Sequence, residues 1–129
     1  MTSTQHRAVV ERFWAAMAAN DFRAAATILH DDYVLEWPQS GERIRVRDNF
    51  VAVNEHYPAA GSWRFMLRRI VADRGAHATE VEVSDGVRRD RAITFSELRD
   101  GRIVRQVEYW PDPMEAAPWR ARWVERTDG

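Results

Sequence analysis

The chain has 129 residues, of which 19 are basic and 20 acidic, so its formal net charge is −1. The charges are interspersed and form no basic stripe, which argues against nucleic acid as a partner. The chain contains no cysteine, which excludes a disulfide framework, a thiol nucleophile and a thiolate metal site.

The length suits one domain over residues 1–129, with room for one core and one pocket. The N-terminus lacks a charged segment followed by an apolar leader, and no apolar run approaches a membrane span. We therefore expect a cytoplasmic protein without a membrane partner. Six tryptophans are many for this length, and because Trp is usually buried they suggest a cavity or an interface in addition to a small core.

The N-terminal part predicts two helices. Thr2 and Gln5 have the spacing of a capping box, so the first helix should begin near Ser3. Its apolar stripe consists of Val9, Val10, Phe13, Trp14 and Met17. Asn20-Asp21 breaks this helix, and Asp21 can cap a second, short one. The second helix is marked by Phe22, Ala25, Ala26 and Leu29 and is expected to end at His30-Asp31-Asp32.

A short hairpin and a third helix are expected next. Tyr33 to Trp37 predicts a strand that Pro38 halts, and Arg43 to Val46 predicts its return. Asp48 is a good N-cap for the third helix. The apolar stripe of this helix carries Phe50, Val53 and Tyr57, and Pro58 and Gly61 end it.

The remainder predicts four antiparallel strands, because short turns with Asp and Gly separate them. Their ranges are Trp63 to Ala72, His77 to Ser84, Val87 to Leu98 and Arg102 to Trp110. Prolines exclude regular structure in the tail, although Trp119 to Arg126 could form one or two turns. The order predicts an α+β fold. We expect a conical barrel, in which a curved antiparallel sheet wraps around the long first helix, with two shorter helices, and encloses a pocket.

The last predicted strand carries the leading candidate for chemistry. Side chains alternate along a strand, so Ile103, Arg105, Val107 and Tyr109 share one face, and Val104, Gln106, Glu108 and Trp110 share the other. A carboxylate between an amide and an indole suits a partly polar cavity. Burial makes a carboxylate a better proton acceptor, so Glu108 is a candidate acid or base. The alternative is that Glu108 lies at a rim, paired with an arginine.

The order of elements and two strings resemble the nuclear transport factor 2-like superfamily, in particular its SnoaL-like polyketide cyclase and ketosteroid isomerase branches. The strings are VERFWAAMAANDFRAAATILHDDYVLEWP near the start and FSELRDGRIVRQVEYW near the end. The tail, EYWPDP followed by APWRARWVER, is also similar to that of many members. The resemblance implies a conical α+β barrel with a deep pocket, usually a homodimer through the outer face of the sheet. The fold hosts enzymes, binders and dimerisation modules.

The isomerase branch can be compared residue by residue. Where that branch has a general-base Asp at the end of the first strand, this chain has Trp37, and where it has an oxyanion-binding Tyr in the first helix, this chain has Phe13. The branch's protonated Asp in the penultimate strand corresponds to Thr94. Ketosteroid isomerisation by that mechanism is therefore not expected. The Asp-Arg-Asp cluster of the epoxide hydrolase branch cannot be placed in this sequence. The same register puts Gln106, Glu108 and Trp110 on the pocket side.

Further candidates surround the expected pocket. His56 is a candidate proton shuttle at the end of the third helix, although a His there is also favoured by the helix dipole. Candidate ligand-binding residues, which could equally be core, are Trp14, Tyr33, Trp37, Tyr57, Trp63, Thr94, Gln106 and Trp110. Glu80 and Glu82 alternate with two valines and are expected to face solvent, near the many strand arginines. If the valines instead face a dimer partner, the two glutamates face the pocket and could join Glu108.

No cofactor and no metal are expected. The four histidines show no short ligand spacing, and His30-Asp31-Asp32 is better explained by turn and capping preferences. No glycine-rich phosphate loop is present.

Three functions remain open at this point. The first is a cofactor-free acid/base enzyme, a cyclase, isomerase or dehydratase, acting on a small hydrophobic or aromatic molecule. The second is a non-catalytic module that binds such a molecule. The third is a dimerisation domain whose pocket is vestigial and filled by tryptophans.

Overall fold

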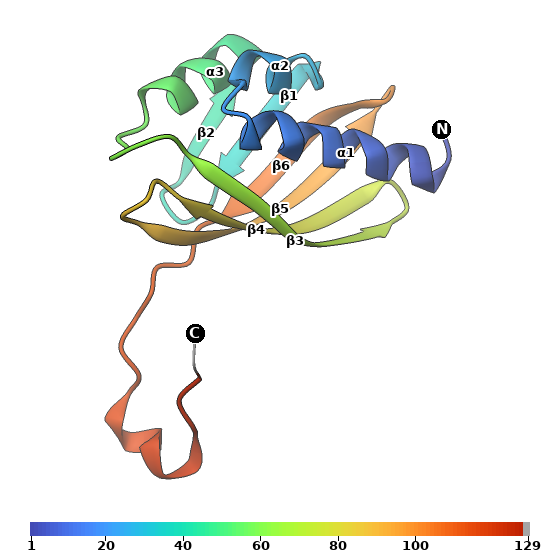
Figure 1. The fold of residues 1–129 in the computed structure, drawn as a ribbon. Helices are drawn as coiled ribbons and strands as arrows, with labels where there is room; N and C mark the ends of the chain where they lie inside the picture. The colour runs from blue at the N-terminus through green and yellow to red at the C-terminus, as the bar shows by residue number, and fades with distance from the viewer. Residues whose placement is uncertain (128–129) are drawn as a thin grey trace.

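The computed structural model describes residues 1–127, and Figure 1 shows the arrangement of its elements. In chain order they are α1 (Ser3–Ala18), α2 (Phe22–Ala26), β1 (Leu29–Trp37), β2 (Glu42–Arg45), α3 (Arg47–His56), β3 (Arg64–Asp73), β4 (Ala76–Ser84), β5 (Arg89–Arg99), β6 (Arg102–Tyr109) and the 3-10 helix η1 (Pro118–Trp123). Among these residues no helix combines the length and apolar character needed to cross a membrane.

The strands form one curved, unclosed sheet in the order β2-β1-β6-β5-β4-β3. Neighbouring strands are antiparallel except for the pair β1 and β6, which is parallel. The three α-helices lie on one side of the sheet, with α1 running across it (Figure 1). The expected α+β fold, a curved sheet around a long first helix, is therefore confirmed.

Helix α1 follows its sequence pattern closely. The Thr2 N–H donates to Gln5 Oε1 over 2.7 Å, and the Gln5 N–H donates to Thr2 Oγ1 over 3.1 Å, which completes the predicted capping box. All five residues of the predicted stripe are buried. Asp21 caps α2 by accepting the Ala24 N–H over 3.0 Å. The local signals of this region are thus confirmed.

The end of α2 and the start of β1 differ from the prediction. The helix ends at Ala26, and Leu29 to Asp32 already belong to β1. Leu29 is fully buried and pairs with Ile103 of β6 in the sheet. Pairing with a strand that is distant in sequence therefore overrides the helical spacing of Leu29.

The start of α3 also differs. The helix begins at Arg47, and Asp48 lies in its first turn instead of capping it. The N-cap position is held by Val46, whose φ of 64° lies in the left-handed region. Because β2 ends at Arg45, a single residue must turn the chain from strand to helix. The left-handed conformation is unfavourable for a β-branched residue, so the backbone of Val46 is strained.

Strand β6 contains a bulge that changes one predicted face. Glu97 pairs with Arg105 and Leu98 pairs with Ile103, so Val104 has no partner across the ladder. The extra residue turns Ile103 into the core, where it is fully buried, instead of leaving it on the face of Arg105. Beyond the bulge the alternation holds, because Gln106 and Glu108 are buried and Tyr109 is exposed.

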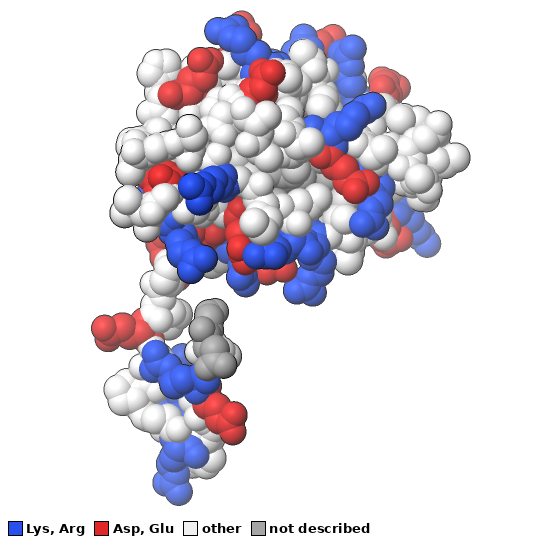
Figure 2. Space-filling model, in the orientation of Figure 1, with Lys and Arg blue, Asp and Glu red and all other residues white. Residues whose placement is uncertain are grey.

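Residues 111–127, here called the C-terminal arm, leave the end of β6 and run away from the helices and the sheet (Figure 1). The arm contains η1, which agrees with the turns expected near Trp119. On the face drawn in Figure 2, basic and acidic side chains are mixed, and no large patch carries a single sign.

Candidate functional site

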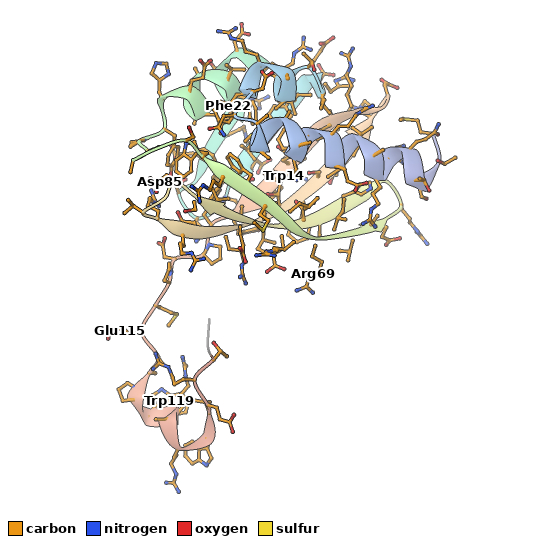
Figure 3. All side chains as sticks on the ribbon, viewed as in Figure 1. Trp14, Phe22, Arg69, Asp85, Glu115 and Trp119 are labelled. Carbon is orange, nitrogen blue, oxygen red and sulfur yellow. The ribbon has the colours of Figure 1, made fainter. Side chains whose placement is uncertain are left out.

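A cavity of about 710 Å³ lies between the helices and the inner face of the sheet. Eight of its 24 lining residues are aromatic, and these are Phe13, Trp14, Trp37, Phe50, Tyr57, Trp63, Phe65 and Trp110. Figure 3 shows Trp14 on α1, directed toward the sheet. The polar side chains Gln106 and Glu108 of β6 also line the cavity.

Glu108 accepts hydrogen bonds on both carboxylate oxygens. Its Oε1 accepts the indole N–H of Trp37 over 3.0 Å and that of Trp110 over 2.8 Å. Its Oε2 accepts the hydroxyl of Thr94 over 2.6 Å. Trp37 ends β1, and Thr94 faces Glu108 across the β5–β6 ladder, so three neighbouring strands assemble the site.

Glu108 is 7% exposed, and its three partners are neutral donors. Within the described residues, no Arg or His side chain forms an ion pair with it. The alternative of a rim glutamate paired with an arginine is therefore not what the structure shows. A carboxylate has about four acceptor positions, so three bonds leave capacity for a group on a ligand.

A second buried network lies beside Glu108. The Tyr33 hydroxyl donates to Gln106 Oε1 over 2.6 Å, and Gln106 Nε2 donates to Ser96 Oγ over 3.1 Å. Burial, and then the charge of Glu108, raise the pKa of Tyr33 well above its usual value. The phenol therefore stays protonated and fixes the orientation of the Gln106 amide.

The structure brings most of the predicted ligand residues to the cavity. Its wall includes Trp14, Trp37, Tyr57, Trp63, Gln106 and Trp110. Tyr33 and Thr94 lie behind this wall, bonded to Gln106 and Glu108. Ser96 was not identified from the sequence, although it lies on the face of β5 that carries Thr94.

Tyr57 and Trp63 both line the cavity and are in contact with each other. Tyr57 follows α3 and is 46% exposed, so it does not lie on the buried stripe predicted for that helix. Its ring packs edge-on against Trp63 with 5.8 Å between centroids. Asn20 fixes the backbone of Trp63: Asn20 Nδ2 donates to the Trp63 carbonyl over 2.6 Å, and the Trp63 N–H donates back to Asn20 Oδ1 over 3.0 Å.

His56 lies apart from this assembly. Its side chain is exposed at the end of α3, and its Nδ1 lies 2.8 Å from the carbonyl oxygen of Ala52. It is not among the residues that line the cavity. The geometry thus gives His56 no direct contact with Glu108 or with the aromatic wall.

Glu80 and Glu82 face away from the cavity, as expected. Glu80 pairs with Arg69 and Arg91 over 3.2 and 3.0 Å, and Glu82 pairs with Arg68 over 3.0 Å. The intervening Val81 and Val83 are buried in the core. These two carboxylates therefore do not join Glu108.

The charged residues that line the cavity, Glu42, Arg43, Arg45, Asp90 and Asp112, were not identified from the sequence. They come from β2, from the start of β5 and from the first residues of the C-terminal arm, where polar residues give no signal that distinguishes a rim from an ordinary surface. In residues 1–127, no three His, Asp or Glu side chains converge as the ligands of a metal ion would.

The comparisons with known proteins agree with the geometry. Residues 10–106 match the sequence profile of the SnoaL-like domain. A crystal structure from Kribbella flavida, described as a candidate ketosteroid isomerase, is 30% identical, with a TM-score of 0.89 over 98% of this chain and 92% of that chain. A nuclear transport factor 2-like protein of unknown function from Burkholderia xenovorans is 36% identical, with a TM-score of 0.80 over 96% of each chain.

An LEH-like epoxide hydrolase from M. tuberculosis is 27% identical, with a TM-score of 0.68 over 84% of each chain. A comparison with proteins of curated function finds no match. The profile covers most of the chain, and the two relatives that are at least 30% identical share its fold over nearly the whole length. The chain therefore belongs to the SnoaL-like family, within the nuclear transport factor 2-like superfamily.

Proposed function

We propose that the protein is a cofactor-free enzyme that moves a proton on a small hydrophobic or aromatic molecule, with Glu108 as the acid/base group. The observation that carries this proposal is a carboxylate held by three neutral donors at the wall of an aromatic cavity. A pocket of this size with a few convergent polar groups is the usual form of a small-molecule site.

The chemistry requires only groups of the chain. Glu108 takes a proton from a carbon or hydroxyl of the ligand and returns it at another position, which suits cyclisation, isomerisation or dehydration. Gln106, oriented by Tyr33 and Ser96, can donate its second amide N–H to a ligand oxygen that gains negative charge. The low dielectric of a dry cavity strengthens both interactions.

The residues around Glu108 indicate a mechanism different from that of ketosteroid isomerases. Trp37 and Thr94 stand where the sequence comparison places the two catalytic aspartates of that branch, and here both donate to Glu108. The chain thus has one carboxylate where that comparison expects two, and the carboxylate comes from a neighbouring strand. This supports a proton-transfer enzyme whose substrate need not be a steroid.

The experiment is a ligand screen followed by a turnover assay. Polycyclic, steroid-like and terpenoid compounds are tested by thermal shift between pH 5 and 9. A compound at 100 times its Kd should stabilise the protein by about 2.7 kcal/mol. For a ligand that is converted, Glu108→Gln should still bind it and should lose at least about 100-fold in rate, because acid/base groups typically contribute that much.

Glu82→Gln is the matched control, because it makes the same chemical change on the outer face of the sheet. It should leave turnover unchanged. Retention of full turnover by Glu108→Gln would reject Glu108 as the acid/base group.

The second candidate function is a non-catalytic binding module. The absence of the isomerase branch's two aspartates at Trp37 and Thr94, and of its tyrosine hydroxyl at Phe13, favours it. A ligand that binds equally to the wild type and to Glu108→Gln, and is never converted, would identify the protein as a binder.

We also propose that the protein acts as a homodimer through the outer face of the sheet. Val71, Ala78, Phe95 and Val107 are register partners on four adjacent strands and form one apolar row. Phe95 is 50% exposed and packs edge-on against Tyr109. Contiguous exposed apolar side chains of this kind mark interaction surfaces.

A further inference from the structure

The η1 part of the C-terminal arm is exposed, whereas Asp112 near the start of the arm lines the cavity of its own copy. No residue of η1 is buried, and Trp119 and Trp123 are 73% and 68% exposed. Figures 1 and 3 show the arm, with Trp119 labelled, extending away from the side of the sheet that is opposite the helices. The arm thus presents two of the six tryptophans of the chain to solvent.

The chemistry of the arm is that of a binding segment. The guanidinium carbon of Arg122 lies 4.6 Å from the ring centroid of Trp123, so a cation–π contact supports the shape of η1. Trp and Arg are the residues that most often dominate the binding energy of protein interfaces. A buried Trp contributes about 150–250 Å² of contact area, whereas an exposed one gains nothing for folding.

Three prolines restrict the course of the arm. Pro111, Pro113 and Pro118 each fix φ, and each disfavours a helical conformation in the residue before it. The segment between β6 and η1 is therefore stiff and extended, and it does not fold back over its own sheet.

The alignments with two related proteins include part of the C-terminal arm. Residues 1–110 make up only about 85% of the 129 residues, whereas the alignments with the proteins from Kribbella flavida and Burkholderia xenovorans cover 98% and 96% of the chain. Both alignments therefore extend into the arm. A C-terminal segment of comparable length is thus part of these relatives as well.

We propose that the arm of each copy docks on a second copy of this chain, in a two-fold exchange that places Trp119 and Trp123 against the partner. This inference rests on the homodimer proposed above. In the proposed homodimer, the second copy packs on the apolar row of the outer sheet face. The arm extends from this same side of the molecule (Figure 1). A two-fold axis then gives each copy one donated arm and one received arm.

Energetics favour the exchange over the sheet contact alone. Stable interfaces bury about 1,200–2,000 Å² in total. The apolar row is bordered by paired charges such as Arg69 with Glu80 and Arg105 with Glu36, which limits its apolar area. Four tryptophans from two arms would add roughly 600–1,000 Å², which provides a large part of such an interface.

The test measures the dimer dissociation constant by sedimentation, between about 0.1 and 100 μM, for the wild type and two arm variants. The first variant is Trp119→Ala with Trp123→Ala, and the second is a chain that ends at Pro113. Both should raise the dissociation constant at least about 10-fold, as loss of central aromatic residues does. Neither changes the core, so circular dichroism should still report the α-helices and the sheet in both variants.

Two controls separate this inference from the proposed homodimer. Met114→Ala changes an exposed arm residue before η1 and should leave the constant within twofold of the wild type. Phe95→Arg places a charge in the apolar row and should abolish the dimer. If Phe95→Arg dissociates the dimer but both arm variants leave the dissociation constant unchanged, the arm exchange is wrong and the sheet dimer is retained.

A wild type that is monomeric at 100 μM would overturn both proposals. Acrylamide quenching gives an independent measurement. The difference between the wild type and the double variant Trp119→Phe with Trp123→Phe is the fluorescence of the two arm tryptophans. This fluorescence should be shielded from acrylamide in the dimer and should become accessible when dilution dissociates it. Equal accessibility at both concentrations would contradict the exchange.

Discussion

Glu108 is bonded to two indoles and one hydroxyl, each of which comes from a different position in the chain. The alternation of side chains predicts that Gln106, Glu108 and Trp110 share the pocket side of the last strand, and all three line the cavity. The partners Trp37 and Thr94 have no such local signal. They meet Glu108 because β1 and β5 both pair with β6.

At the scale of single residues, Tyr33 offers the sharpest stability test. Tyr33→Phe removes the hydroxyl that donates to Gln106 and leaves a buried amide oxygen without that donor. The expected cost is about 1–3 kcal/mol of unfolding free energy, measured by urea denaturation. Since the Tyr33 hydroxyl lies behind the wall, Gln106→Leu with Tyr33→Phe should recover part of this loss. A loss that the double variant does not reduce would show that the two side chains are not coupled.

At the scale of elements, the sequence predicts what is encoded locally. The capping box of Thr2, the stripe of α1 and the turn at Asp100-Gly101 each act within a few residues, and each is found in the structure. The start of β1 at Leu29 is set by pairing with Ile103, about 70 residues further along the chain, which no local pattern reveals. The bulge at Val104 lies within the β5–β6 hairpin, where the turn at Asp100-Gly101 is recognisable but the register of the two strands is not. Without that register, the contact of Ser96 with Gln106 could not be predicted either.

The loop before β3 is tied to the β4–β5 turn by Asp85, whose carboxylate provides the pH-dependent prediction. Asp85 accepts the N–H of Ala60, Val87 and Arg88 over 2.9, 3.0 and 2.8 Å. These donors lower the pKa of Asp85 from 3.8 to about 2. Because the folded value is depressed, the stabilisation is complete above pH 4 and is lost as the pH falls through 2.

The measurement compares the thermal midpoints of the wild type and Asp85→Asn from pH 2 to 6. The wild type should be the more stable protein above pH 4, and the difference should shrink toward pH 2. Repetition in about 0.5 M salt is the control, because salt screens exposed charge pairs far more than short hydrogen bonds. A difference that stays constant over the whole range would contradict the role of the ionised carboxylate.

At the scale of the whole molecule, the open cavity is itself a cost. A volume of about 710 Å³ separates α3 from the inner face of the sheet, and its aromatic wall lacks the contacts that a closed core would provide. The cavity remains open even though Trp14, Trp37 and Trp110 line it, so these tryptophans do not fill it. Proteins that bind ligands commonly have a lower unfolding free energy than a fully packed core would give.

Val53→Phe tests whether this volume serves a ligand. Val53 lines the cavity from α3 and is half-buried, so a larger side chain there occupies empty space. We expect a gain of about 0.5–2 kcal/mol in unfolding free energy, as is common when a cavity is filled. A ligand found in the thermal-shift screen should bind Val53→Phe at least about 10-fold more weakly, because the variant occupies its site.

Ala52→Phe is the matched control, since residue 52 is exposed on the same helix and does not line the cavity. Ala52→Phe should leave both the unfolding free energy and the ligand affinity at the values of the wild type. If the ligand binds Val53→Phe as tightly as the wild type, it binds outside the cavity, and Glu108 cannot be its proton acceptor. If Val53→Phe is more stable and binds weakly, the empty volume is maintained for the ligand, because closing it would otherwise have stabilised the fold at no loss.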